Sequence, residues 1–215
     1  VPDIIVSDVM MPRMNGYKLC KTIKEDINIS HIPVILLTAR DDRQSQISGY
    51  KNGADGYLSK PFEVEMLMEL IRNRLKNREY TKKRYLNAGL IPTPEESTIS
   101  LTDETFLIKL NSIIQENIEN SNLGIQFICQ EVGLGRSSLY NKLKALTGMG
   151  ANEYISKLRI EKAITLISGT DMPFSEIAEK TGFTTPSYFS TAFKQYTGET
   201  PSQYKERKKK GLADK

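Results

Sequence analysis

Two kinds of hydrophobic pattern divide the chain. In its first part, short runs of mainly apolar residues at Ile4–Ser7, Val34–Thr38 and Gly56–Ser59 are typical of buried parallel strands. Stretches with helical spacing or polar helical character lie between and after these runs, at Gly16 to about Ile27, at about Arg43–Asn52 and around Leu67–Leu75. Strands that alternate with helices at these intervals predict β-α units around a parallel sheet.

The second part of the chain is predicted to be helical beyond a linker. After Asn77 the strand and helix pattern gives way to a charged helix tail and then to Ile91–Ser97, whose prolines stop helices. Beyond this segment an apolar helix face is formed by Phe106, Leu107, Leu110, Ile113, Ile114 and Ile118. We therefore predict an α/β domain at residues 1–78, a linker at residues 79–102 and an all-α domain at residues 103–215.

An internal repeat is the most specific feature of the helical part. Four residues recur 49 positions later, where Ile128, Cys129, Gly133 and Leu134 match Ile177, Ala178, Gly182 and Phe183. After a turn that is one residue longer, the offset becomes 50, and Leu139, Leu143 and Leu146 match Phe189, Phe193 and Tyr196. Each copy is predicted to be a short helix, a glycine-containing turn and a second helix, which is a helix-turn-helix arrangement.

The second helix of each copy has two different faces. The matched apolar residues share one side and are expected to pack inward, Tyr196 included. The opposite side carries Ser137, Tyr140, Asn141 and Lys144 in the first copy and Ser187, Ser190, Thr191 and Lys194 in the second. Short polar side chains with one lysine can meet base edges and phosphates in a major groove. Ordinary solvated faces of a helical bundle are the alternative, which the repetition of the pattern disfavours.

Charge and spacing agree with a polyanionic partner. The chain has a net charge of +4, and the window Gln126–Lys210 holds 13 Lys and Arg residues against 8 Asp and Glu residues. Between the copies, Ala151–Ser168 is expected to form one helix of about 27 Å. This length is close to the roughly 34 Å between successive major-groove faces. The basic tail Lys205–Lys210 could add phosphate contacts.

One stretch resembles a known family. The segment Gly182–Lys194, followed by Gly198–Tyr204, is similar to the C-terminal signature of AraC-type transcription regulators. This resemblance implies a seven-helix domain whose third and sixth helices enter adjacent major grooves. It implies base-facing roles for Ser137, Tyr140, Asn141, Ser187, Ser190 and Thr191. We expect Lys144, Thr185 and Lys194 to belong to the same DNA-binding surface, and Arg136 to contact a phosphate.

Three chemical groups follow the predicted strands of the α/β part. Asp8 and Thr38 come at the ends of the first two strands, and Lys60 directly follows the third. The carboxyl ends of parallel strands are where such sheets place their sites, and these groups suit phosphoryl capture. The set resembles the flavodoxin-like receiver domain of response regulators. That resemblance implies Asp8 as phosphoacceptor and Mg²⁺ ligand, and Thr38, Lys60 and the aromatic Tyr57 as switch residues.

This sequence departs from the receiver pattern at its beginning. Receivers have two further strands and an acidic pair that binds Mg²⁺ upstream of the phosphoacceptor, whereas seven residues precede Asp8. We therefore expect a partial receiver that lacks its first two strands, holds an incomplete Mg²⁺ site and does not autophosphorylate. The first residue, Val1, indicates a piece of a longer protein. Segments Cys20–Asp26 and Ser30–Arg40 are similar to receivers near the end of hybrid two-component regulators, and a stand-alone response regulator stays open.

The expected function is regulation of transcription by a phosphorelay. The partners would be promoter DNA, a histidine kinase as phosphodonor and RNA polymerase, with dimerisation through the receiver. The rival classes are a phosphohydrolase, for which no second catalytic carboxylate is evident, and a protein-binding helical module.

No apolar run approaches the roughly 18 residues of a membrane span, so we expect a cytoplasmic location, either free or as the cytoplasmic end of an inner-membrane sensor. We expect Cys20 and Cys129 to be reduced and buried, and His31 to be non-catalytic.

Overall fold

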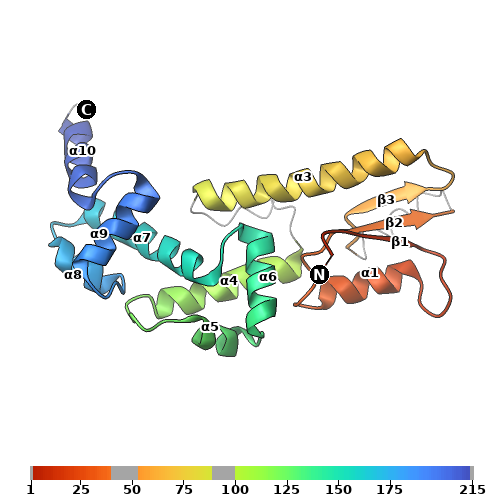
Figure 1. Cartoon of the computed structure of the whole chain (residues 1–215), viewed down its shortest axis with the longest axis horizontal. Helices are drawn as coiled ribbons and strands as arrows, with labels where there is room; N and C mark the ends of the chain where they lie inside the picture. The colour runs from red at the N-terminus through yellow and green to blue at the C-terminus, as the bar shows by residue number, and fades with distance from the viewer. Residues whose placement is uncertain (1, 40–52, 89–99, 214–215) are drawn as a thin grey trace. The chain divides into compact units, whose positions relative to one another are not determined.

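The computed structural model describes residues 2–39, 53–88 and 100–213 (Figure 1). The chain divides into two compact units. The first consists of Val1–Ile108 and Ser137–Gly148, and the second of Lys109–Arg136 and Met149–Lys215. The helix expected at about Arg43–Asn52 and the proline-containing segment of the linker lie outside the described residues.

A parallel sheet forms the centre of the first unit. Its described strands are β1 (Ile5–Asp8), β2 (Val34–Thr38) and β3 (Gly56–Ser59), which lie side by side in this order. β2 pairs with both neighbours, with Val34 opposite Ile5 and Ile35 opposite Gly56. β2 is buried on both faces, which explains why it is a continuous apolar run rather than an alternating one. The three predicted strands are confirmed, with β1 shifted by one residue.

Helix α1 (Gly16–Glu25) begins directly against the end of β1. The side chain of Asn15 caps it by accepting a hydrogen bond from the backbone N–H of Lys18 at 2.8 Å. A Cβ atom on Gly16 would lie 2.4 Å from the carbonyl oxygen of Asp8, so this close approach requires glycine. α1 buries Cys20 and Ile23 in the core beneath the sheet. Figure 1 shows α1 and α3 on opposite faces of the sheet.

Helix α3 (Val64–Ala88) is longer than its apolar spacing alone predicts. The amphipathic pattern ends near Asn77, but the helix continues for eleven more residues. Residues 76–88 contain neither Gly nor Pro and are rich in Lys and Arg, which cost little free energy in a helix. The beginning of the segment expected to be a linker is therefore helical.

The predicted apolar faces of α4 (Leu101–Glu116) and α6 (Arg136–Thr147) are buried. In α4 the buried residues are Phe106, Leu107, Leu110, Ile113 and Ile114, followed by Ile118 just beyond its end. In α6 the three leucines at positions 139, 143 and 146 are at most 5% exposed. These expectations from helical periodicity are confirmed.

The second unit is helical in its described residues. It contains α5 (Ile125–Val132), α7 (Ala151–Gly169), α8 (Phe174–Lys180), α9 (Pro186–Thr197) and α10 (Pro201–Ala213). Phe183, Phe189, Phe193 and Tyr204 form a chain of ring contacts in its core, with centroids 5.4–5.7 Å apart. Edge-on and tilted contacts of this kind add to the free energy from burial. Cys20 is buried as expected, whereas Cys129 is only partly buried.

The prediction that Tyr196 packs inward is wrong. Its side chain is 41% exposed, and its hydroxyl lies 3.3 Å from Oε1 of Glu161. Partial burial and the negative charge of Glu161 raise the pKa of Tyr196 to about 12. The phenol needs a polar partner, unlike the Leu146 side chain at the matched position, and it therefore lies at the edge of the helix face.

Candidate functional site

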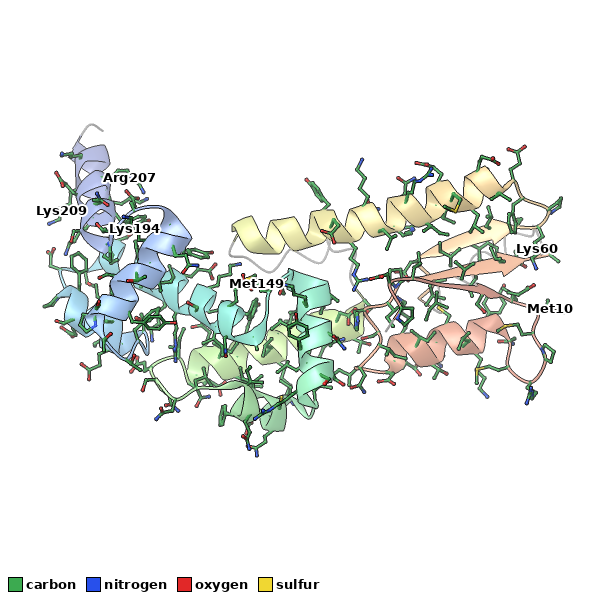
Figure 2. All side chains as sticks on the ribbon, viewed as in Figure 1. Met10, Lys60, Met149, Lys194, Arg207 and Lys209 are labelled. Atoms are coloured by element: carbon green, nitrogen blue, oxygen red, sulfur yellow. The ribbon has the colours of Figure 1, made fainter. Side chains whose placement is uncertain are left out.

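The ends of the three strands bring Asp8, Thr38 and Lys60 to one edge of the sheet. Asp8 lies opposite Leu37, so Thr38 comes one position beyond it on the neighbouring strand, opposite Ser59. The backbone N–H of Lys60 donates to the carbonyl oxygen of Thr38 at 2.6 Å. The ammonium of Lys60 forms an ion pair with Oδ2 of Asp8, across the width of the sheet. Figure 2 shows Lys60 and Met10 at this same end of the strands.

The surroundings of Asp8 favour its ionised form. The hydrogen bond from Lys60 lowers the pKa of Asp8 most, and the backbone N–H of Met10, which donates to Oδ1 at 3.0 Å, lowers it further. The side chain of Asp8 is 34% exposed and that of Lys60 is 39% exposed. A carboxylate that is ionised and open to solvent can attack an electrophile, and a lysine beside it can neutralise negative charge.

Thr38 and Tyr57 differ in how deeply they are buried and in what they contact. Thr38 is 2% exposed, so its hydroxyl lies at the buried end of β2. Tyr57 is half-buried in β3, and its hydroxyl lies 3.1 Å from the hydroxyl of Tyr17 in α1. The two tyrosines thereby link α1 to the far strand of the sheet. The switch roles of Thr38, Tyr57 and Lys60 stay predictions.

The described residues near Asp8 do not by themselves fit a magnesium ion. Both oxygens of its carboxylate already accept hydrogen bonds, from Met10 and from Lys60. Within the described ranges, no group of three or more His, Cys, Asp or Glu side chains is placed to hold a metal. Mg²⁺ prefers six oxygen ligands, of which Asp8 could supply one.

The polar face of α6 is open to solvent. Arg136, Ser137, Tyr140, Asn141 and Lys144 are all exposed, with the Tyr140 side chain at 55%. The guanidinium of Arg136 donates to Oε1 of Gln126 at 3.3 Å, so it is held against α5 at the beginning of the helix. The structure thus presents every residue that the sequence assigned to this face, and contact with DNA stays a prediction.

The matching face of α9 is built on a well-capped helix. Thr185 is the N-cap, and its hydroxyl accepts a hydrogen bond from the backbone N–H of Tyr188 at 3.1 Å. Ser187, Thr191 and Lys194 are exposed, and Ser190 is half-buried. The hydroxyl of Thr191 donates to the carbonyl oxygen of Ser187 at 3.1 Å. Figure 2 shows the lysine of this face on α9.

The basic residues of α10 are largely paired with acids. Arg207 forms two hydrogen bonds with Oε1 of Glu199, at 2.7 and 3.0 Å, and Lys210 lies 2.8 Å from Glu206. Lys209 lies 3.6 Å from Asp171. These pairs lie at the surface and are worth little stability, but they offset the positive charge that the sequence suggested for phosphate contacts.

Two residues of α6 and α9 escaped the sequence analysis. Tyr188 is 55% exposed beside the predicted face of α9, while its ring makes an edge contact with Phe183 at 5.7 Å. Lys142 of α6 is fully buried. Helical spacing contained a signal for Lys142, because it lies three residues after Leu139 and four before Leu146, at the border of the inward face.

The strand-end carboxylate and the two polar helix faces are the arrangement expected of a regulator with a signal-receiving part and a nucleic-acid-binding part. Comparisons with known proteins agree. The family profile described as "Response regulator receiver domain" matches residues 1–72, and that described as "Helix-turn-helix domain" matches residues 128–207. Neither profile is that of an enzyme. Among the described helices, none is both long and apolar enough to cross a bilayer.

Two curated relatives cover most of the chain. "Histidine kinase P4" of Formosa agariphila is 43% identical over 207 residues, which are 96% of this chain and 15% of that protein. "Probable transcriptional regulator ycf29" of Pyropia yezoensis is 30% identical over 162 residues, which are 70% of this chain and 73% of that protein. The chain thus spans about a seventh of the length of the first relative and about three quarters of the second.

Part of the chain is similar to a solved structure. The C-terminal domain of AraT, a response regulator from Geobacillus stearothermophilus, is 31% identical and covers 47% of this chain and 84% of its own, with a TM-score of 0.45. From the profiles and the relatives, the chain belongs to the two-component response regulators, with a receiver domain followed by an AraC-type helix-turn-helix domain. The fold class expected from the sequence is confirmed.

Proposed function

We propose that phosphorylation of Asp8 controls how this protein binds promoter DNA. The observation that carries this proposal is the ion pair between Asp8 and Lys60 at the ends of the parallel strands. An Oδ atom of Asp8 attacks the phosphorus of a kinase phosphohistidine, the P–N bond breaks, and its electron pair returns to the imidazole. Lys60 then pairs with the phosphoryl oxygens, and Thr38 donates its hydroxyl to them.

The output of this regulator is sequence-specific DNA binding. We assign base contacts to Ser137, Tyr140 and Asn141 in α6 and to Ser187, Ser190 and Thr191 in α9. We assign contacts with phosphates, at the edges of the two faces, to Lys144, Lys194, Thr185 and Arg136. Except for Ser190, which is half-buried, these residues are exposed, and their exposure supports this assignment. The connecting helix α7 supports it too, because 19 residues make a helix of about 28 Å in the chain between the two copies.

The other steps of the phosphorelay involve partner proteins. The phosphodonor is a histidine kinase, and the relative named as a histidine kinase favours a hybrid arrangement over a stand-alone regulator. Phosphorylation changes dimerisation through the receiver, so that DNA-binding domains pair on repeated sites and reach RNA polymerase. We place the receiver at residues 1–78 and the DNA-binding domain at 103–215, in the cytoplasm. Mg²⁺ is expected in the whole protein, with ligands besides Asp8.

Phosphotransfer tests the acceptor. The whole protein is incubated with its kinase and γ-labelled ATP, and the label is tested for release by hydroxylamine, which attacks acyl phosphates. Asp8→Asn should abolish labelling of the peptide that contains position 8, because the amide is a poor nucleophile. Glu25→Gln, which changes an exposed carboxylate at the other end of α1, should label normally. Acyl-phosphate label retained in the receiver of Asp8→Asn would place the phosphoacceptor elsewhere.

DNA binding tests the output. Duplexes selected from a random pool by the protein itself serve as probes, and mobility shifts give affinity and stoichiometry with and without phosphorylation. We expect phosphorylation to tighten binding or to raise the number of chains per duplex. Unchanged affinity and stoichiometry would contradict control by the receiver, while absence of any selected sequence would contradict specific DNA binding.

A further inference from the structure

A fully buried charge pair lies on the inner side of α6. The ammonium of Lys142 is 0% exposed and forms an ion pair with Oδ1 of Asp103, which is 3% exposed and lies in the first turn of α4. The ring of Phe106 lies 5.1 Å from the ammonium. Buried ions of this kind are stable only when hydrogen bonds replace the water that they lose.

Ser30 supplies part of that replacement from the loop between α1 and β2. Its hydroxyl donates to Oδ1 of Asp103 at 2.7 Å and accepts from the ammonium of Lys142 at 2.8 Å. Ser100 donates to the other carboxylate oxygen at 2.8 Å. Ser30 is itself 0% exposed, so one hydroxyl of the receiver closes a buried network with a helix 112 residues further along the chain.

The loop that carries Ser30 is tied back to the sheet. Lys24 of α1 donates to the carbonyl oxygens of Ser30 and Ile32, at 3.3 and 2.9 Å. The same ammonium forms an ion pair of 2.7 Å with Asp55, which precedes β3 and accepts a hydrogen bond from the backbone N–H of Val34. Thr102 in turn donates to the carbonyl oxygen of Lys24 at 2.9 Å. Polar contacts therefore run without a break from the sheet to Lys142.

We propose that Ser30 is the contact through which the receiver positions the first recognition helix. Lys142 shares α6 with Tyr140, Asn141 and Lys144, so a shift of α6 on its buried side also moves the face assigned to DNA. When the loop between α1 and β2 moves away from α6, the ion pair of Lys142 and Asp103 loses its hydrogen bonds with Ser30, and water must replace them. This inference rests on the proposed function for its consequence, but the contact itself stands independently of it.

A small cavity makes the second arrangement accessible. A cavity of about 70 Å³ lies beside the network, and its lining includes the polar residues Ser30, His31, Ser100 and Asp103. This volume has room for about two water molecules. Nδ1 of His31 is buried and has no hydrogen-bond partner among the described residues. A water molecule in the cavity would form a hydrogen bond with this atom. In the second arrangement of our proposal, water in the cavity takes the place of the Ser30 hydroxyl on the ion pair.

Amine labelling tests the contact. The whole protein is treated with an acetylating reagent, and the rates at Lys142 and Lys144 are compared by mass spectrometry. Lys144 is the matched control, because it is exposed and lies two residues away on the same helix. Lys142 should react at least about tenfold more slowly, since it must open locally to be reached. Ser30→Ala should speed its reaction several-fold, whereas Ser168→Ala, at an exposed serine, should not. Equal rates at the two lysines, or no effect of Ser30→Ala, would overturn the contact.

Phosphorylation tests the coupling. The ratio of DNA affinities with and without phosphorylation is measured for the unaltered protein and for Ser30→Ala. We expect the ratio to approach one in Ser30→Ala, while binding itself persists because no assigned DNA contact is removed. A full ratio in Ser30→Ala would overturn the inference and leave the proposed function intact. No phosphorylation effect in the unaltered protein would instead contradict the proposed function, and the labelling rates would still report on the contact.

Discussion

Gly182 lies so close to Ile118 that a Cβ atom on the glycine would come within 2.1 Å of the carbonyl oxygen of Ile118. The glycine also has a φ of +72° and would crowd the guanidinium of Arg159, whose Nη2 atom would lie 2.9 Å away. Its equivalent in the first copy of the repeat, Gly133, has nearly the same φ of +73°, but a Cβ atom there would meet no described atom within 4 Å. Both turns therefore need glycine for its left-handed backbone, and the second turn needs it also for the close approach to Ile118.

Alanine substitutions at these two glycines should separate backbone strain from collision. Gly133→Ala introduces only the strain of the left-handed conformation and should lower the free energy of unfolding by about 1–2 kcal/mol. Gly182→Ala should lower it further, because backbone at Ile118 must move as well. Urea denaturation of both variants gives the comparison. Equal losses would contradict the close approach of Gly182 to Ile118.

The two exposed lysines of the recognition helices should contribute to DNA affinity through phosphates. Lys144→Ala and Lys194→Ala should each weaken binding to all duplexes and reduce the slope of log affinity against log salt by about 1. Lys109→Ala, at an exposed lysine of α4, is the control and should leave the slope unchanged. A slope that responds to neither lysine would favour a protein-binding helical module over a DNA-binding one.

Asn141 should read a base rather than a phosphate. An asparagine can make two hydrogen bonds to adenine. Asn141→Ala should therefore weaken the free energy of DNA binding by about 1–3 kcal/mol and relax specificity at one base pair. The salt slope should stay as it is. Competition between the selected duplex and its single-position variants measures this, with Asn122→Ala as an exposed asparagine outside the face. Uniform weakening across all variants would argue against a base contact.

His31 should make stability depend on pH. Burial is the main cause that lowers the pKa of His31 to about 4, and the positive charges of Lys142, Arg78 and Lys24 lower it further, while Asp103 acts in the opposite direction. Below the ordinary value near 6.5 the unfolded chain binds the proton and the folded chain does not. The free energy of unfolding should therefore fall by about 2 kcal/mol from pH 7 to pH 5 through this group.

Two measurements check this effect. Urea denaturation at both pH values should show a smaller fall in His31→Gln than in the unaltered chain. Because His31 is the one histidine of the 215 residues, its ring resonances in NMR also report the titration directly. A titration midpoint near 6.5 would show that the ring is open to water and not enclosed beside Asp103.

Local periodicity predicted much of the architecture. The run Val34–Thr38 was recognisable as a strand because both of its faces are buried, and the spacing of Leu139, Leu143 and Leu146 identified the inner side of α6. Periodicity did not reach the end of α3, because the charged helix tail to Ala88 has helix-forming residues but no apolar stripe. It also failed for Tyr196, because an aromatic residue with a hydroxyl can lie at either border of a helix face.

The sequence by itself determined the regulator class, the strand-end set of Asp8, Thr38 and Lys60, and the two polar helix faces. These depend on the order of elements and on spacing within one element. Only the tertiary structure decided that Lys142 is buried with Asp103 and Ser30. A lysine on a helix is ordinarily exposed, and its burial requires partners from two distant segments that no local pattern brings together. For the same reason, the collision at Gly182 became visible only once Ile118 was placed beside it.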